Sequence, residues 1–440
     1  MKFVTDYKLE NFILETRWQQ LPDDVQQRLR GCLLDLLGAL ISGSGSRQFQ
    51  VGVKLAKALF RDGNVAAIGT KERFSVSGAA TAMGHSSNAY DIDDGHNIIR
   101  AHPGTSFIGG LLAAAYEKNL GATDFLTALY VAYESTIRMG AAIMDYYQYA
   151  HSSGTFGAIG VVAGVGRIYG FTKEQLNNAL SVSEFNAPLV PGIRSVEYPS
   201  MNKDGVPFGV MIGQLALAAN TCGFTGNKHL LEAEEYAHYL DDLGEKHQVM
   251  DLYFKPYPCC RWGHPAIDAC LAVMQAHQVS PEEIEAVTVE TFFKATQLSK
   301  GIPASADEAQ YNIAYPVASA IVNGGFSIAQ VEETGDPRVH RMMEKLAFEC
   351  DPELDAQFPG KRLCRVRMKL TGGREVVSGV HEPRGEAFEN IGYTWLSEKF
   401  CRITAHKLTK NQQETIISLL QQDAWSVPQL VETINEYLDI

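Results

Sequence analysis

Residues 22–40 read PDDVQQRLRGCLLDLLGAL and predict a long helix with one apolar face. Apolar side chains recur there at three- and four-residue spacing, which is the spacing of a buried helix face: Val25, Leu29, Cys32, Leu33, Leu36, Leu37 and Leu40. The same pattern predicts helices over residues 105–118, 123–143 and 154–169, and another that begins at Ser75. We therefore expect the first 260 residues to be nearly all helical.

The pattern changes after Pro281. Residues 284–292 are rich in Val and Thr, and residues 363–370 alternate apolar and basic side chains, so both predict strands. The Gly pair at 372–373 predicts a compact turn into a further strand through 376–377. Helices are predicted at 311–322, 339–348 and 410–422, with capping residues at Thr172, Gln175 and Ser426 marking the starts of two others.

These patterns predict a mainly α protein with two domains. We expect a large all-helical domain built from residues 1–267 and 396–440, because the closing helices carry apolar stripes that can return to it. A smaller α+β lid domain, residues 268–395, is expected as an insertion before the C-terminal helices. A chain of 440 residues is also longer than one typical compact core.

Net charge and composition restrict the kinds of molecule that the protein is expected to bind. The net charge of −13 argues against nucleic acid or an anionic membrane surface as partner, so an anionic ligand must meet a local positive pocket. The first residues lack the basic-then-apolar layout of a signal peptide, and no apolar run reaches the roughly 18 residues of a membrane span. We therefore expect a cytoplasmic protein with reduced thiols.

Three carboxylates, two histidines and an arginine gather where a small-residue helix ends: Asp91, Asp93, Asp94, His96, Arg100 and His102. Such a cluster favours proton-transfer chemistry on an anionic substrate. Two other interpretations stay open, namely a solvated loop whose carboxylates cap the helix that starts near Thr105, and a divalent metal site. The spacing matches no specific metal motif, so no metal ligand is assigned.

Three further segments carry chemistry-bearing residues. Tyr146 and His151 precede a glycine-rich helix whose N-terminus could dock a substrate carboxylate. Lys203 lies just before the N-terminus of a later helix. It also completes a chance match to the S-x-x-K motif of serine acyl-enzymes, whose companion motifs are absent from this sequence. Lys255 is followed by Arg261 and His264. This segment is either a zinc site with too few ligands or a hinge between domains that carries substrate-binding cations.

Several of these motifs together resemble the MmgE/PrpD family over nearly the whole chain: AYDIDD (89–94), HPG (102–104), GTFGA (154–158), KDG (203–205) and KPYPCCRWGHPAID (255–268). Members include 2-methylcitrate dehydratase, cis-aconitate decarboxylase and iminodisuccinate epimerase. The resemblance implies a small di- or tricarboxylate substrate handled without metal or organic cofactor. It also implies a large helical domain with an α+β lid, usually as a homodimer.

The resemblance also implies site residues. It places Asp91, His102, His151, Lys203 and Lys255 at active-site positions and adds Tyr315 from the lid. Some features depart from the dehydratase and decarboxylase pattern and look more like the epimerase branch. Gly95 stands where those members usually have threonine, Arg100 precedes Ala101-His102, and Tyr146 lies five positions before His151. In the epimerase branch the resemblance implies that the tyrosine and the lysine that matches Lys203 act as opposing bases.

The chemistry expected from these residues is acid–base catalysis beside a carboxylate. Lys203 or His102 is the expected base, His151 or Tyr146 the acid, and Asp91 an orienting group. Substrate-binding roles are expected for Lys255, Arg100, Arg261, Tyr315 and His264. We predict a lyase of the dehydratase or decarboxylase type, with an epimerase or isomerase of a substituted dicarboxylate as the alternative. A pyridoxal phosphate enzyme and a non-catalytic helical scaffold have weaker support.

Overall fold

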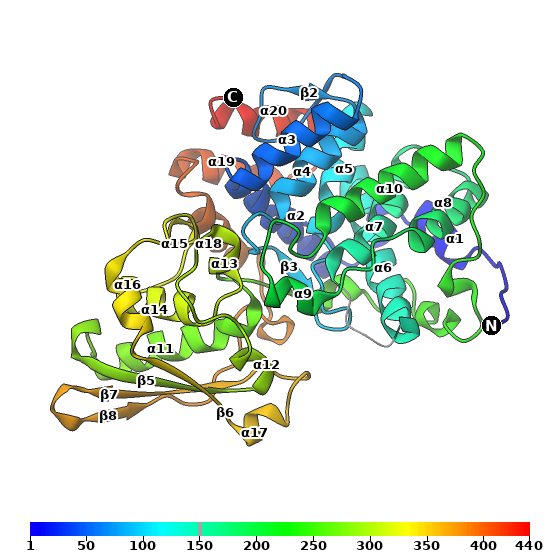
Figure 1. Ribbon diagram of the computed structural model, residues 1–440. Coiled ribbons are helices and arrows are strands. Elements are labelled where there is room, and N and C mark those ends of the chain that lie inside the picture. The colour runs from blue at the N-terminus through cyan, green and yellow to red at the C-terminus, as the bar shows by residue number, and fades with distance from the viewer. Residues whose placement is uncertain (148–151) are drawn as a thin grey trace.

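The computed structural model describes residues 1–147 and 152–440. Figure 1 shows a large helical body and a smaller part in which helices cover a sheet. The helices of the first stretch are α1 (Lys8–Glu15), α2 (Asp23–Gly43), α3 (Arg47–Leu59), α4 (Val76–Ser87), α5 (Thr105–Glu117), α6 (Ala122–Tyr147), α7 (Ser153–Ile168), α8 (Lys173–Phe185), α9 (Gly192–Glu197) and α10 (Val206–Thr221). The described part is thus mainly α, as the sequence predicts.

The second stretch mixes helices and strands. Its helices are α11 (His264–His277), α12 (Phe293–Thr296), α13 (Ala306–Gln310), α14 (Ala314–Asn323), α15 (Ile328–Glu332), α16 (Pro337–Met343) and α17 (Pro352–Asp355), followed by α18 (Tyr393–Thr404), α19 (Lys410–Leu420) and α20 (Val427–Tyr437). Short strand pairs lie in the helical body: β1 (Val65–Ala66) with β2 (Arg73–Phe74), and β3 (Asp94–His96) with β4 (Leu252–Phe254). None of the helices in the described ranges is both long and apolar enough to cross a bilayer.

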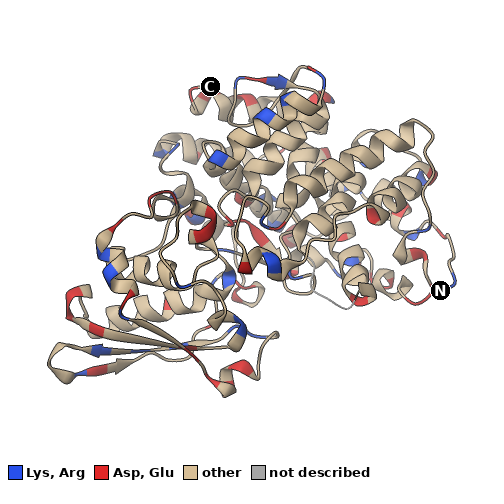
Figure 2. Ribbon diagram, viewed as in Figure 1, with Lys and Arg blue, Asp and Glu red and all other residues tan. Residues whose placement is uncertain are grey.

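One four-stranded sheet has the order β6-β5-β7-β8. Its strands are β5 (Ile284–Thr291), β6 (Leu346–Cys350), β7 (Cys364–Leu370) and β8 (Glu375–Val377). The β7–β8 pair is antiparallel, which confirms the predicted hairpin. Basic side chains on the outer face of β7 meet acidic ones, as in the pair Arg365–Glu290, and both colours appear along the sheet in Figure 2.

The prediction of a helix over residues 339–348 is wrong in its second half. Helix α16 ends at Met343, and Leu346–Cys350 form β6, which pairs in parallel with β5. Leu346 and Phe348 stand two residues apart and pack against the core of this part, while Ala347 between them is exposed. Pairing with β5 therefore decides the conformation of a segment whose local pattern is ambiguous.

The closing helices return to the helical body, where α18 packs on α2 (Figure 1). Gly31 and Gly38 of α2 make this approach close, because a Cβ on Gly38 would lie 3.2 Å from the Phe400 ring. The buried apolar side chains fall into one large helical cluster and a second cluster around the sheet. The second cluster also contains Tyr90 and Ile92, so the loop that carries Asp91 lies where the two parts meet.

The predicted capping box opens α8. The Thr172 hydroxyl accepts from the Gln175 amide at 3.2 Å, and the Gln175 side chain accepts from the Thr172 amide at 2.9 Å. Thr172→Ala should lower stability by about 1 kcal/mol, measured as a fall in the urea unfolding midpoint, because an unpaired N–H remains at the helix start. The same change at exposed Thr415, inside α19, should not destabilise, since Ala is the better helix former. Equal losses at both positions would contradict the capping role.

Candidate active site

A cavity of about 460 Å³ lies between the helical body and the part that contains the sheet. Its polar lining on the helical side comprises Asp91, Arg100, His102, Ser152, Asp204, Tyr253 and Lys255. From residue 261 onward, the lining includes Arg261, Trp262, Lys294, Tyr311, Phe358 and Arg362. Clefts between such parts are common places for small-molecule sites.

The loop after α4 holds its carboxylate in an uncommon backbone conformation. Asp91 has a φ of 49°, in the left-handed region that non-glycine residues seldom adopt. Two buried lysines hold the carbonyls on either side of it. Lys203 donates to the carbonyls of Asn88 and Ala89, and Lys399 donates to the Ile92 carbonyl at 2.6 Å. These contacts fix the loop from both ends and offset the local strain.

Lys399 has its own buried partner. Its ammonium lies 2.5 Å from a carboxylate oxygen of Asp35 on α2, and both side chains are about 1% exposed. Burial raises the pKa of Asp35 to about 6, against the opposing effect of Lys399. Helices α2 and α18, which lie near opposite ends of the chain, thus together support the Asp91 loop.

Strand pairing brings Lys255 to Asp91. Strand β3 pairs antiparallel with β4, so the residue after β4 lies beside the loop that precedes β3. The Lys255 ammonium is 2.5 Å from Asp91 Oδ1, and both side chains are buried. Burial alone would lower the pKa of Lys255, but Asp91 and Asp93 raise it above its ordinary value. The result is a protonated lysine facing the cavity.

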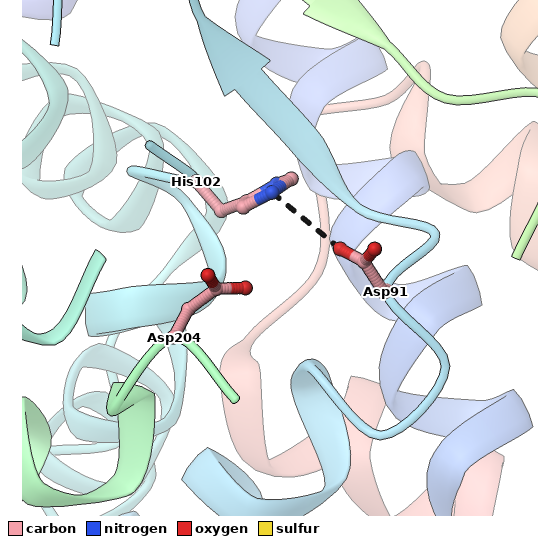
Figure 3. Close-up of side chains that lie close together, drawn as sticks. All are labelled: Asp91, His102 and Asp204. Carbon is pink, nitrogen blue, oxygen red and sulfur yellow. Dashed lines mark ion pairs between the residues drawn. The ribbon is translucent and has the colours of Figure 1, made fainter. Parts of the chain in front are cut away.

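His102 is held by three groups of the same acidic loop. Its Nδ1 lies 2.5 Å from the Asp94 carbonyl and 3.3 Å from Asp93 Oδ2, while Nε2 lies 3.5 Å from Asp91 Oδ1. Burial would lower the pKa of His102, but the Asp93 charge and hydrogen bond raise it well above its ordinary value. The imidazole is therefore a cation near neutral pH, with Nε2–H as a proton to give. Figure 3 shows its ring directed toward Asp91.

Asp204 completes the polar centre from the loop before α10. Ser152 donates a hydrogen bond to its Oδ1, and the Tyr311 hydroxyl donates to Oδ2 at 3.3 Å. Figure 3 shows its carboxylate facing the same space as the His102 ring and the Asp91 carboxylate. Burial and the Asp204 charge raise the pKa of Tyr311 well above its ordinary value, so this hydroxyl stays protonated.

One oxygen or nitrogen atom each of Asp91, His102 and Asp204 lies within 4.8 Å of the others, a set of the right ligand types for a metal ion. The charges around these three residues do not suit a bound metal ion. The Lys255 ammonium already pairs with Asp91, and a protonated His102 has no lone pair to donate on Nε2. A divalent ion would therefore have to displace one cation and deprotonate another.

The cavity is rich in positive charge. Arg100, Lys294 and Arg362 line it without an ion pair anywhere in residues 1–147 and 152–440. Arg261 also lines it, with an ion pair to Glu386 and a 2.7 Å hydrogen bond to the Asn97 side chain. Although the whole chain is acidic, this wall is suited to several carboxylates at once.

The sequence predicts Lys203 and Tyr146 as catalytic residues, but neither lines this cavity. The Lys203 ammonium lies among backbone carbonyls and the Gln310 side chain, 2.9 Å from Oε1, and 3.6 Å from Asp307. Burial lowers its pKa, against the opposing Asp307 charge. Tyr146 is 41% exposed and packs its ring against Tyr147 and Tyr236. His151 lies outside the described residues.

Two residues expected to bind substrate lie in protein cores instead. The Tyr315 hydroxyl donates to the carbonyls of Gln330 and Glu333 inside the sheet-containing part. His264 is fully buried, with Nε2 on the Cys259 carbonyl at 3.0 Å. Burial and the neighbouring Lys255 charge hold the pKa of His264 well below its ordinary value, so it stays neutral. Both residues make internal hydrogen bonds, and neither lines the cavity.

The cavity also contains polar residues that were not singled out from the sequence: Asp204, Tyr253, Lys294, Tyr311 and Arg362. Asp204 directly follows Lys203, and that motif contained the only signal for it. The others are ordinary strand, helix or loop residues in the local pattern. Only the packing of distant segments reveals them.

Comparison with known proteins places the chain in a family. Residues 7–242 match the MmgE/PrpD N-terminal domain and residues 257–423 match the MmgE/PrpD C-terminal domain. A cis-aconitate decarboxylase-like protein, oryM, of Aspergillus oryzae (strain ATCC 42149 / RIB 40) is 23% identical over 422 residues, which cover 86% of each chain.

Two further relatives have similar names. Human cis-aconitate decarboxylase is 22% identical over 434 residues, 91% of this chain and 88% of its own. Cis-aconitate decarboxylase of Aspergillus terreus (strain NIH 2624 / FGSC A1156) is 22% identical over 410 residues, 83% of this chain and 82% of its own. The two domain matches together span most of the chain and both sides of the cavity, and the chain belongs to the MmgE/PrpD family.

Proposed function

We propose that the protein is a lyase that removes carbon dioxide from a small di- or tricarboxylate. The observation that carries this proposal is the state of His102, a partly buried imidazolium fixed by Asp93 and Asp94 beside a cavity with several cations. Loss of carbon dioxide leaves an electron pair on carbon, and a proton donor at that place completes the reaction.

The cations support the substrate class. Lys255 is held near the proton donor, while Arg100, Lys294 and Arg362 come from different segments around the same cavity. Cations that converge on a partly enclosed site stabilise negative charge more strongly than in water. A ligand with two or three carboxylates uses this wall fully, whereas a neutral ligand would leave it unpaired.

The proposed step breaks one carbon–carbon bond and forms one carbon–hydrogen bond. The carbon–carbon bond to one carboxylate breaks, carbon dioxide leaves, and the electron pair remains on the substrate, stabilised by the cations. His102 Nε2 gives its proton to the carbon, and solvent reprotonates the imidazole. Asp93 and the Asp94 carbonyl hold Nδ1, which keeps Nε2 as the atom that exchanges the proton.

Decarboxylation has more support than epimerisation. Relatives over most of the chain carry the name cis-aconitate decarboxylase. Epimerisation needs two bases on opposite faces of the substrate, and the pair expected for it was Tyr146 and Lys203. Tyr146 packs on surface aromatic rings, and the Lys203 ammonium lies among loop carbonyls.

The direct test is a substrate assay. Purified protein is incubated with cis-aconitate, citrate, 2-methylcitrate and aspartate-derived acids in turn, and carbon dioxide and new alkenes are measured. Carbon dioxide release from one of the polycarboxylates supports the proposal. An alkene formed with loss of water and no carbon dioxide indicates a dehydratase, and inversion of a stereocentre without either product indicates the epimerase alternative.

The raised pKa of His102 sets the pH dependence. Because its folded pKa lies well above the usual value of about 6.5, activity should persist through neutral pH and fall on the alkaline side as the proton is lost. The same shift contributes stability that is fully present below about pH 6.5 and disappears as the pH rises through the folded pKa. Activity that rises as the pH increases through this range would contradict a protonated His102 as the donor.

Lys203→Met separates loop support from proton transfer. The variant loses the contacts to the Asn88 and Ala89 carbonyls, so Asp91 shifts and kcat should fall by about tenfold to hundredfold. The alkaline limb of the pH–rate profile should remain, because His102 is unchanged. Loss of that limb together with a decrease beyond about thousandfold would instead identify Lys203 as the group whose proton the reaction needs.

A further inference from the structure

A glycine in β3 makes room for an aromatic ring at the cavity wall. Gly95 is the register partner of Tyr253 in the β3–β4 pair. A Cβ on Gly95 would lie 2.6 Å from Tyr253 Cε2 and overlap the hydroxyl end of the ring as well. The backbone of Gly95 is not among the positive-φ positions, so the space for Tyr253 is the reason for glycine here.

The ring in turn places a cation. The Arg261 guanidinium lies over the Tyr253 ring, with Cζ 3.6 Å from the ring centroid. A guanidinium held on an aromatic face keeps its charge while it loses contact with water. Both residues line the cavity, and Tyr253 is only 6% exposed. Tyr253 therefore contacts both Gly95 and the Arg261 guanidinium, and so connects β3 to the segment before α11.

The phenol oxygen lies among the charged groups of the site. It is near enough to His102, Lys255 and Arg362 to contribute to the electrostatic surroundings of each. A hydroxyl there can donate a hydrogen bond to a carboxylate that the same cations attract.

We propose that Tyr253 is a substrate-binding residue whose hydroxyl donates a hydrogen bond to a carboxylate oxygen of the bound polycarboxylate, and whose ring positions Arg261 for a second carboxylate. This inference rests on the proposed function and deepens it by naming a specificity residue. Gly95 is the positioning residue that allows the ring to lie at the wall.

Two single variants separate the hydroxyl from the ring. Tyr253→Phe keeps the ring and its stacking on Arg261, so KM should rise about tenfold to hundredfold with kcat nearly unchanged. Gly95→Ala adds one methyl group, which pushes the ring from the wall and removes both contributions, so kcat/KM should fall about hundredfold or more. Thermal unfolding of each variant shows whether the fold is retained.

A double variant shows that Gly95 acts through the ring. Tyr253→Ala alone should lose about as much kcat/KM as Gly95→Ala, and the combined variant should lose little more, since the methyl group then meets no ring. Full additivity of the two losses would overturn the positioning role of Gly95. A KM for Tyr253→Phe equal to that of the unchanged protein would overturn the role of the hydroxyl.

A binding measurement separates this inference from the proposed function. Citrate is titrated into the full-length protein and into Tyr253→Phe by calorimetry, which needs no turnover. Binding that weakens about tenfold or more in the variant supports the inference even if the reaction differs from decarboxylation. Equal binding overturns the inference and leaves the proposed function standing. If the unchanged protein binds and converts none of the polycarboxylates, both are overturned.

Discussion

His102→Gln should lower kcat by about a hundredfold to ten-thousandfold, the largest effect expected of a single substitution in this protein. The amide of Gln can still meet the Asp94 carbonyl, which His102 now contacts at 2.5 Å, but it has no proton to transfer. Substrate binding should change much less, because the cations of the cavity remain. Steady-state kinetics with the substrate found in the assay measures both quantities.

The control for this variant is His277→Gln, an exposed histidine near the end of α11. It should leave kcat unchanged. His102→Gln also leaves Asp93 without its cationic partner, so thermal unfolding is followed and rates are compared where both variants are folded. A folded His102→Gln variant with near-normal kcat would exclude this residue as the proton donor.

Lys255→Met should affect stability and activity together. The change leaves Asp91 buried without the ammonium that now lies 2.5 Å from it, and breaking such a pair costs about 3–5 kcal/mol. Activity should fall by about a hundredfold or more, because a substrate carboxylate loses a charged partner in the cavity. Urea unfolding and steady-state kinetics measure the two effects.

The pH dependence identifies the origin of this loss. Burial already raises the pKa of Asp91, and removal of Lys255 raises it further. A carboxyl group whose pKa is higher in the folded than in the unfolded state makes the protein less stable as the pH rises. The free energy of unfolding of the variant should therefore be lowest toward alkaline pH.

The control is Lys57→Met, which breaks an exposed pair with Glu72 and should change stability by less than about 1 kcal/mol. Equal effects of the two substitutions would contradict a buried pair at Asp91.

Local patterns predict most of the architecture because burial periodicity and capping residues act over short distances. The apolar face of residues 22–40 became α2, and the alternating residues 363–370 became β7. β6 escaped prediction because Leu346 and Phe348 also fit the end of a helix. Its strand conformation depends on β5, which lies more than fifty residues earlier in the chain.

The site was predicted in part for a similar reason. Asp91, His102 and Lys255 meet as expected, because the acidic loop and the segment after β4 carry recognisable motifs. A motif does not show where a long side chain points, so the burial of Lys203 among loop carbonyls could not be predicted. The sequence does not indicate that Tyr253 lies at the cavity, because its ring fits there only where Gly95 on the paired strand has no side chain.

The most direct test of the central claim follows the fate of the proton. The protein is incubated in D2O with the polycarboxylate that it converts, and NMR follows the product carbon while released carbon dioxide is measured. If a group that exchanges with solvent gives a proton to carbon as carbon dioxide leaves, each product molecule gains one deuteron for each carbon dioxide released, and His102→Gln slows both together. Deuterium that enters the substrate without any carbon dioxide would contradict this chemistry and identify an isomerase.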